Sequence, residues 1–255
     1  MILAVDIGNS NVVIGGFEND KIEFTARIAT DVSRTEEQYA VEIFQILHLY
    51  GYQAEKMEGS IISSVVPPLT TILKTALRTI IGKKPLVVGP GLKTGLNIKL
   101  DNPSSLGADR VADTVAAIRE YPLPLLVVDM GTATTMSVTN EKEEFIGGAI
   151  MPGLPLSLEA LSSKTSLLPH IDLTVPKSVI AKNTIDAMNS GMIYGTASMV
   201  DGMIDRIQQE MELPLTVVAT GGLSKCIVPH CKHTIIQDPD LLLKGLRILY
   251  YKNIK

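Results

Sequence analysis

Residues 125–135, LLVVDMGTATT, pass from an apolar run directly into an aspartate, a glycine and a series of hydroxyl side chains. Residues 3–12, LAVDIGNSNV, show the same order of residue types near the start of the chain. Aligning Asp6 with Asp129 also superposes Gly8 on Gly131 and Val5 on Val128. The chain therefore contains an internal repeat, in which each copy places a carboxylate at the end of a run typical of a buried strand.

The segments that follow the two motifs also repeat. The first half predicts strands at 1–6, 11–17 and 21–28, a helix at 33–51, a strand at 59–66, a helix at 67–82 and a strand at 85–89. The second half predicts strands at 125–130, 134–140 and 143–150, a helix after residue 153, a long helix from about residue 183, a strand at 215–220, a further helix and a C-terminal helix from about residue 240. This order predicts a duplicated α/β unit, with two lobes packed around one ligand-binding cleft.

Three of the predicted helices carry apolar faces that indicate where they pack. The helical period places Ala40, Ile43, Phe44 and Leu47 on one side of the first helix, and Leu69, Ile72, Leu73, Ala76, Leu77 and Ile80 on one side of the second. The long helix of the second half carries Met188, Met192, Met199 and Met203 along one side, with Gly191 and Gly195 four residues apart. This pattern indicates core packing with close approach of another helix, and a dimer interface is the alternative.

Composition and charge narrow the class of protein. The chain has 255 residues and a net charge of −4, which disfavours non-specific binding to nucleic acid because such binding needs a basic surface. No apolar stretch reaches the roughly 20 residues of a membrane span, and the N-terminus lacks the pattern of a secretory signal. Cys226 and Cys231 are too few for a disulfide framework, and their spacing with His230 and His233 matches no strong zinc signature. We therefore expect a cytoplasmic protein with reduced thiols that binds neither nucleic acid nor membranes.

The two Asp-x-Gly turns are the strongest candidates for binding phosphate. Each glycine lets the backbone reverse between adjacent strands, so that backbone N–H groups and small polar side chains face the ligand. These side chains belong to Asn9, Ser10, Asn11, Thr132, Thr134 and Thr135. A buried carboxylate next to phosphates requires a cation between them, so Asp6 and Asp129 predict a metal ion. For a single copy, an aspartate that only stabilises its own turn is the better reading, but the duplication favours nucleotide binding.

A third candidate is residues 102–117, NPSSLGADRVADTVAA. A helix is expected to begin near Ala108, which places Asp109 and Arg110 in its first turn. An acidic residue is common in the first turn of a helix. An arginine is unfavourable there because of the helix dipole, unless it binds an anionic partner. Asp109 could accept a proton from a substrate hydroxyl as a general base. The residues alone leave this reading and a solvated helix start equally open.

Two glycine-rich segments are weaker candidates. Residues 89–95, GPGLKTG, match neither the dinucleotide fingerprint nor the P-loop, and they are expected to form a turn. Residues 217–224, VVATGGLS, end a strand with two glycines, against which a flat ligand such as adenine could lie. No nucleophile motif is found, so the sequence does not support covalent catalysis.

Taken together, these motifs resemble the type III pantothenate kinases of bacteria, which belong to the acetate/sugar kinase, Hsp70 and actin superfamily. The resemblance covers essentially the full chain. Its motifs are DIGNSN at 6–11, TGLNI at 94–98, NPSSLGADR at 102–110, VVDMGTATT at 127–135, GGAIMPG at 147–153, KNTIDAMNSG at 182–191 and ATGG at 219–222. The ordered set is highly specific, and LGADR with DMGTATT is close to diagnostic.

The resemblance implies a fold and a reaction. The fold would be α/β, with two duplicated ribonuclease H-like (actin-like) domains facing one nucleotide cleft, the N-terminal lobe at 1–118 and the C-terminal lobe at 119–255. The reaction would be ATP-dependent phosphorylation of pantothenate to 4′-phosphopantothenate, the first step of coenzyme A biosynthesis. Mg²⁺ would accompany ATP, and K⁺ or NH₄⁺ would be the monovalent cation of a homodimeric enzyme.

The resemblance also implies roles for individual residues. Asp109 would be the general base, and Asp129 would coordinate the monovalent cation. ATP would be bound by Asp6, Ile7, Gly8, Asn9, Ser10, Asn11, Val12, Val13 and Thr132. Pantothenate would be bound by Gly107, Ala108, Asp109, Arg110 and Thr184, with Arg110 opposite its carboxylate and Thr184 near the dimer interface.

One departure from the family concerns the pantothenate pocket. Leu100 stands where members often carry a tyrosine, and losing that hydroxyl would cost on the order of 0.5–1.5 kcal/mol of binding free energy. Two other functions stay open at this point: a kinase of the same superfamily that acts on another small alcohol, and a non-catalytic regulatory relative that keeps the fold.

Overall fold

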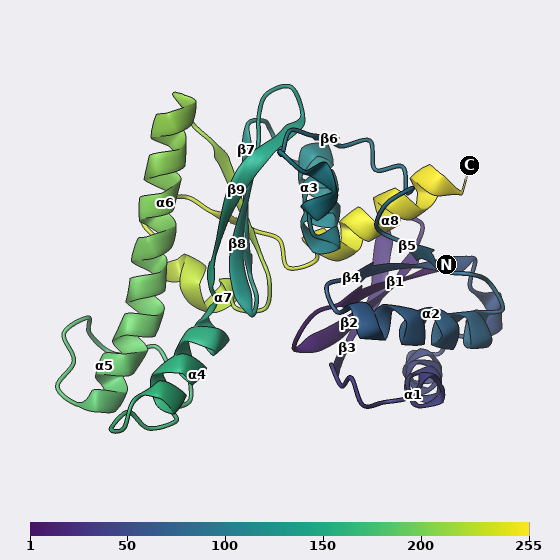
Figure 1. Cartoon of the computed structure of the whole chain (residues 1–255), viewed down its shortest axis with the longest axis horizontal. Coiled ribbons are helices and arrows are strands. Elements are labelled where there is room, and N and C mark those ends of the chain that lie inside the picture. Colours follow the sequence, from purple (N-terminus) through teal and green to yellow (C-terminus); the bar gives the residue numbers. More distant parts are fainter. Residues whose placement is uncertain (255) are drawn as a thin grey trace. The chain divides into compact units, whose positions relative to one another are not determined.

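The computed structural model describes residues 1–254, which form two compact units (Figure 1). The first unit contains Met1–Leu96, Asp101–Ala116 and the chain from Leu241 onward, and the second contains Asn97–Leu100 and Ala117–Asp240. The predicted boundary after residue 118 lies close to one of these divisions. The C-terminal helix, which the prediction assigned to the second lobe, instead packs against the central strands of the first unit.

The first unit is built on a five-stranded sheet. Its strand order is β3 (Lys21–Ala29), β2 (Asn11–Glu18), β1 (Ile2–Ile7), β4 (Gly59–Ser64) and β5 (Leu86–Val87). Strand β1 pairs antiparallel with β2 and parallel with β4. Because β1 has strands on both sides and a covered surface on both faces, its residues are apolar almost throughout, as the sequence pattern predicts.

Helices cover both faces of this sheet (Figure 1). Helices α1 (Glu36–Leu49) and α2 (Pro67–Ile81) pack on the face formed by Leu3, Val5 and Ile7. Helices α3 (Ala108–Glu120) and α8 (Leu241–Asn253) pack on the opposite face, which carries Ile2 and Ala4. The alternation of side chains along β1 therefore determines which pair of helices each residue contacts.

The apolar face predicted for α1 needs one correction. Ala40, Ile43 and Leu47 are buried as expected, but the side chain of Phe44 is 46% exposed. Tyr39 is buried in its place, and its hydroxyl donates to the backbone oxygen of Asp31 at 3.0 Å. A tyrosine can therefore be buried in this helix because its one polar group is hydrogen-bonded.

The second unit has a six-stranded sheet and helices that connect some of its strands. The strand order is β11 (Ile236–Gln237), β10 (Thr216–Thr220), β7 (Leu125–Met130), β8 (Ala133–Thr139), β9 (Glu144–Pro152) and β6 (Asn97–Ile98). The helices are α4 (Leu154–Lys164), α5 (Thr184–Ser190), α6 (Thr196–Met211) and α7 (Ser224–Ile227). Strands β6 and β11 were not predicted, whereas the equally short β5 lies within the predicted strand at 85–89.

The long helix of this unit packs into its core, as its methionines indicate. It runs as α5, a π-helical turn over Gly191–Gly195, and then α6, which lies alongside the sheet (Figure 1). Met192, Met199 and Met203 pack against the cluster that contains Val128 and Val200. No other element of the described chain approaches Gly191 or Gly195 closely, because a Cβ built at either glycine would meet no atom within 4 Å beyond the neighbouring backbone of its own helix. None of the helices over residues 1–254 combines the length and hydrophobicity needed to cross a bilayer.

Candidate functional site

The turn between β1 and β2 is a tight four-residue loop held by its own backbone and by Thr30. The N–H of Gly8 donates to the backbone oxygen of Asn11 at 3.0 Å. The Thr30 hydroxyl donates to the oxygen of Gly8 at 2.7 Å, and the Thr30 N–H donates to the oxygen of Ser10 at 3.1 Å. The side chains of Asn9, Ser10 and Asn11 are exposed.

Two residues of the predicted ATP loop can contribute only their backbone. The side chains of Ile7 and Val12 are fully buried and belong to the core beneath α1 and α2. Val13 and Gly8 are partly buried. Sequence reasoning did not identify Thr30, because its role as a clamp on the turn depends on β3 lying beside β2.

The equivalent turn between β7 and β8 is one residue shorter. Met130 pairs with Thr134 across it, whereas Ile7 pairs with Val12 in the first turn. The N–H of Gly131 donates to the oxygen of Ala133 at 3.1 Å. Thr132 is partly exposed, whereas Thr134 is only 2% exposed.

Gly153 fixes this second turn from outside. Its N–H donates to the oxygen of Thr132 at 3.1 Å, and it is the N-cap residue of α4. A Cβ at this position would lie 2.3 Å from the oxygen of Gly131 and 2.4 Å from that of Thr132. Only glycine allows this approach, so Gly153 is part of the turn although it is distant in sequence.

The two repeated aspartates occupy equivalent places in their sheets. Asp6 lies between Val13 on the antiparallel neighbour and Ser63 on the parallel neighbour. Asp129 lies between Thr135 and Thr220 in the same arrangement. Both aspartates are partly buried. The internal repeat read from the sequence is therefore also a repeat of strand pairing.

Gly221, in the ATGG motif, passes directly over Asp129. Its φ is +85°, and a Cβ there would lie 2.4 Å from Oδ1 of Asp129 and 2.6 Å from the backbone nitrogen and oxygen of Met130. The glycine is required by both its backbone conformation and this contact. The motif that the sequence analysis offered as an adenine surface thus has a structural role at the second carboxylate.

A third group of predicted residues lies at the start of α3. The Arg110 N–H donates to Oδ1 of Asp109 at 2.7 Å, so the carboxylate folds back over the first turn of its own helix. A Cβ at Gly107 would lie 2.4 Å from the same oxygen. Gly107 therefore leaves the space that the Asp109 carboxylate occupies. Ala108, between them, is partly buried.

Arg110 is partly buried among acidic groups. Burial lowers the pKa of its guanidinium, and Asp109 and Asp113 oppose that shift by raising the pKa. The guanidinium stays charged at neutral pH, because arginine does not lose its proton in proteins. Asp113, one helical turn beyond Asp109, is 2% exposed, and sequence reasoning did not single it out. A charged arginine held in this way can bind an anionic ligand.

The structure places several of these residues on one face of the first sheet. Asp6 continues the series Ile2 and Ala4, which packs with α3 and α8. The side chain of Asp6 therefore lies on the face that α3 covers, and α3 carries Asp109 and Arg110. Asp129, Thr132 and Thr184 belong to the second unit. Thr184 is the exposed first residue of α5, after the N-cap Asn183, which accepts from the Asp186 N–H at 2.9 Å.

The residues present are compatible with a cation at either aspartate. Among residues 1–254, no three His, Cys, Asp or Glu side chains come together as metal ligands. A cation at Asp6 or Asp129 would take its other ligands from backbone carbonyls, hydroxyls, water or the nucleotide. These are oxygen ligands of the kind that Mg²⁺ and K⁺ prefer.

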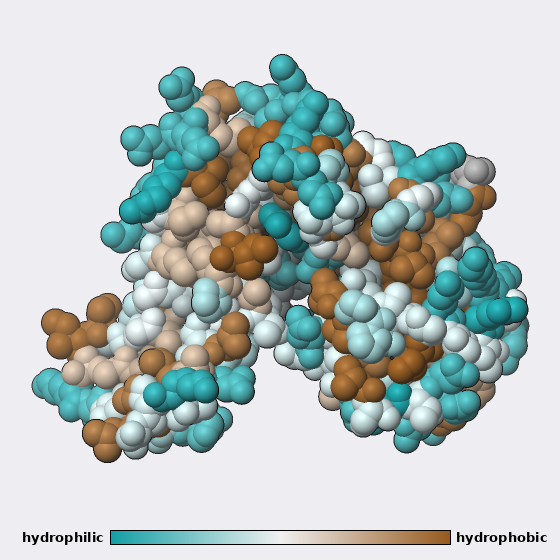
Figure 2. Space-filling model, viewed as in Figure 1, coloured by the Kyte–Doolittle hydropathy of each residue, from teal (hydrophilic) through white to brown (hydrophobic). Residues whose placement is uncertain are grey.

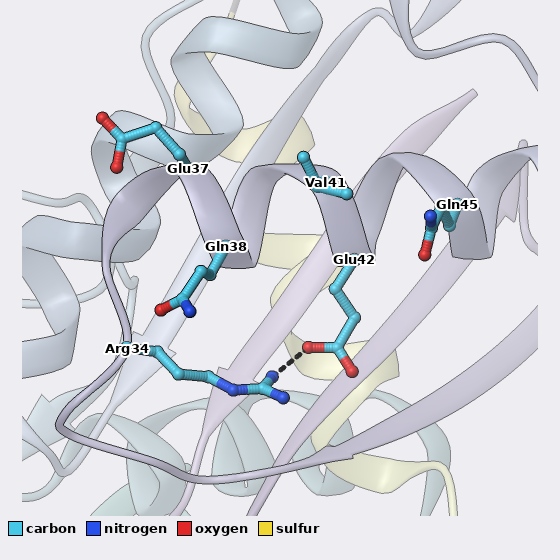
Figure 3. A pocket seen from close by; sticks show the side chains of 6 residues that line it. All are labelled: Arg34, Glu37, Gln38, Val41, Glu42 and Gln45. Carbon is cyan, nitrogen blue, oxygen red and sulfur yellow. Dashed lines mark hydrogen bonds and ion pairs between the residues drawn. The ribbon is translucent and has the colours of Figure 1, made fainter.

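A separate pocket lies along α1 and contains none of the predicted site residues (Figure 3). It is lined by Arg34, Glu37, Gln38, Val41, Glu42 and Gln45. Arg34 forms an ion pair with Glu42, and its guanidinium carbon lies 5.7 Å from the centre of the Tyr39 ring. The pocket is therefore a polar surface groove in which Arg34 and Glu42 pair with each other, while Glu37 points away from them (Figure 3).

Comparison with known proteins identifies close relatives over the full chain. A family model described as type III pantothenate kinase matches residues 2–206. A type III pantothenate kinase of Halalkalibacterium halodurans is 43% identical over 254 residues, which cover 100% of both chains. That of Bacillus cytotoxicus is 45% identical over 253 residues, which cover 99% of this chain and 97% of the relative.

Solved structures with little sequence identity share the fold. The activator of the 2-hydroxyisocaproyl-CoA dehydratase from Clostridium difficile, solved with bound ADPNP, matches with a TM-score of 0.55 at 11% identity, covering 98% of this chain and 93% of that one. The inorganic polyphosphate/ATP-glucomannokinase from an Arthrobacter strain matches with a TM-score of 0.51 at 12% identity, covering 98% of both chains. The predicted α/β fold of duplicated ribonuclease H-like, actin-like domains is thereby confirmed.

Proposed function

Because the chain belongs to the type III pantothenate kinase family, we propose that it transfers the γ-phosphate of ATP to the primary hydroxyl of pantothenate. The observation that carries this proposal is the 43% identity to a pantothenate kinase along the entire chain. The products would be ADP and 4′-phosphopantothenate, the first intermediate on the route to coenzyme A.

The turn from Asp6 to Val13 is proposed to bind the phosphates of ATP, with Thr132 of the second turn contributing its hydroxyl. The exposed side chains of Asn9, Ser10 and Asn11 support this role, and Ile7 and Val12 would act through their backbone. Mg²⁺ bound with ATP would neutralise phosphate charge beside Asp6, without which the carboxylate and the phosphates would repel each other.

Asp109 is proposed to act as the general base. Its carboxylate would accept the proton of the pantothenate hydroxyl while that oxygen forms a bond to the γ-phosphorus and the bond to the ADP oxygen breaks. Gly107 and Ala108 would line the substrate, and Arg110 would pair with the pantothenate carboxylate. The partly buried guanidinium between Asp109 and Asp113 supports this assignment, since a buried charge is stabilised by a bidentate anionic partner.

Asp129 is proposed to bind a monovalent cation, K⁺ or NH₄⁺. The backbone of Gly221 lies against the Asp129 carboxylate, and the backbone oxygen of Met130 lies beside Gly221 as well. A single carboxylate with neutral oxygen ligands suits a monovalent cation, because few charges are needed to balance it.

The enzyme is proposed to be a homodimer, with Thr184 near the interface and in contact with pantothenate. Large apolar side chains are exposed on α4, on α5 and on the segment between them, as Figure 2 shows around these helices. They include Leu156, Leu167, Val175, Val179, Ile180 and Ile185. A concentration of exposed apolar residues of this kind is typical of a protein–protein interface.

A panel of acceptor alcohols tests the reaction. ADP release would be followed with ATP, Mg²⁺ and K⁺, first with pantothenate and then with a series of small sugars and hydroxy acids. We expect turnover with pantothenate well above that with any other alcohol. Faster turnover of another alcohol would instead favour a different kinase of the superfamily, and salt-sensitive DNA binding without ADP release would favour a regulatory relative.

A further inference from the structure

Strand β4 places two hydroxyl groups inside the first unit without hydrogen-bond partners. Ser60 is 1% exposed and Ser63 is 0% exposed. The Oγ atom of neither serine has a hydrogen-bond partner among residues 1–254. A buried hydroxyl that makes no hydrogen bond destabilises the folded state, so its presence in this position requires an explanation.

The two serines lie on opposite faces of the sheet. In the parallel pairing of β1 with β4, Ser63 is directly opposite Asp6, and Ser60 is directly opposite Leu3. Leu3 belongs to the apolar cluster beneath α1 and α2. Asp6 and Ser63 share the other face, which α3 covers with the residues that follow Arg110. Ser63 is thus the partner of Asp6 on β4, on the side of the proposed catalytic residues.

The second unit repeats this combination. Thr220, on β10, is directly opposite Asp129 in the equivalent parallel pairing, and it is 3% exposed. Each unit therefore places a buried hydroxyl beside its repeated carboxylate, in the same register. If these two positions served only packing, an apolar side chain would be expected at both, because a buried hydroxyl costs stability where an apolar side chain does not.

We propose that Ser63 is a positioning residue of the nucleotide site, whose hydroxyl donates a hydrogen bond to an oxygen of the bound Mg²⁺–nucleotide next to Asp6. That oxygen belongs either to a phosphate or to a water on Mg²⁺. The buried hydroxyl then gains its partner only when the nucleotide is bound, so the cost of burying it contributes to affinity. This inference rests on the proposed phosphate-binding role of the turn from Asp6 to Val13.

The test compares Ser63→Ala with the matched control Ser60→Ala. Each variant removes one buried, unpartnered hydroxyl from the same strand, so both should keep or raise the melting temperature of the ligand-free protein. Isothermal titration calorimetry would measure the Kd for ADP in the presence of Mg²⁺ and, separately, in EDTA. We expect Ser63→Ala to weaken Mg²⁺–ADP binding about 3- to 10-fold, the loss of one hydrogen bond, and Ser60→Ala to leave it unchanged.

The ADP titrations with Mg²⁺ and in EDTA, together with an Asp6→Asn variant, distinguish the possible roles of Ser63. Weaker binding of Ser63→Ala in both arms assigns the hydrogen bond to a phosphate oxygen, and weaker binding only with Mg²⁺ assigns it to a metal-bound water. Wild-type affinity of Ser63→Ala, together with weaker binding of Asp6→Asn, would overturn the role of Ser63 and leave the proposed site intact. Wild-type affinity of Asp6→Asn would instead show that the nucleotide site is misplaced, and the inference would fall with it.

Discussion

Asp109 combines a fixed position with access to a ligand. Its carboxylate is held by a 2.7 Å hydrogen bond from the Arg110 N–H, yet the residue is only partly buried. Asp109→Asn keeps the size of the side chain and removes its ability to accept a proton. We expect kcat to fall by about 10²–10⁴-fold with an unchanged melting temperature. Initial rates of ADP release would be compared with those of Asp101→Asn, an exposed residue of the preceding loop, and near-normal activity would remove Asp109 from the mechanism.

Gly107 is expected to affect catalysis through the position of the Asp109 carboxylate. In Gly107→Ala, the new Cβ would meet Oδ1 of Asp109 at 2.4 Å, and the flexible carboxylate would move away. Since only a side-chain end is displaced, stability should change little while kcat falls by at least about 10-fold, because a small displacement of a catalytic group has a large effect on rate. Gly89→Ala is the matched control, since its Cβ would meet no atom within 4 Å. Equal kcat values for the two variants would contradict this account.

Asp129 is the residue at which the cation requirement can be tested. The proposed K⁺ site depends on its single carboxylate, so Asp129→Ala should abolish the activation of the enzyme by K⁺. The measurement is the initial rate as a function of K⁺ concentration, with Na⁺ keeping the ionic strength constant. A K⁺ response that survives in the variant would place the cation elsewhere.

Among the elements, the turn between β7 and β8 depends on a glycine from outside it. In Gly153→Ala, the Cβ would overlap two backbone oxygens that cannot move independently of the sheet. We expect a loss of about 1–3 kcal/mol in the free energy of unfolding, the usual range for overpacking. Gly191→Ala should instead leave stability unchanged or raise it by up to about 1 kcal/mol, because it lies in a helix with open space around it. Denaturant unfolding of both variants checks this difference, and equal stabilities would contradict it.

The elements that carry long periodic patterns could be predicted from the sequence, and the short edge strands β6 and β11 could not. Helix α2 has its predicted apolar face, and β1 and β7 are the buried strands that the repeat indicates. Strands β6 and β11 form only because longer neighbours offer an edge, which no local pattern reveals. For the same reason, Thr30, Gly153 and Ser63 were missed in the sequence. Each acts through a neighbour that tertiary structure brings close.

At the scale of the whole molecule, one prediction needs correction and another can be tested. Helix α8 belongs to the first unit, because its leucines complete the core beside α3, although the sequence order suggested the second lobe. The homodimer remains a prediction that the exposed apolar residues around α5 support. Light scattering should give twice the chain mass of 27.5 kDa for the wild type. Replacing the highly exposed Leu167 and Ile180 together by aspartate should give monomers whose far-ultraviolet circular dichroism spectrum matches that of the wild type. A variant that stays dimeric would place the interface elsewhere.

Phosphate transfer to pantothenate is most directly tested by measuring its product. Purified protein would be incubated with ATP, Mg²⁺, K⁺ and pantothenate, and both ADP and 4′-phosphopantothenate would be quantified by mass spectrometry. The account predicts equal molar amounts of the two products, and formation of both about 10²–10⁴-fold more slowly in the Asp109→Asn variant. ADP that accumulates without phosphorylated pantothenate would contradict it.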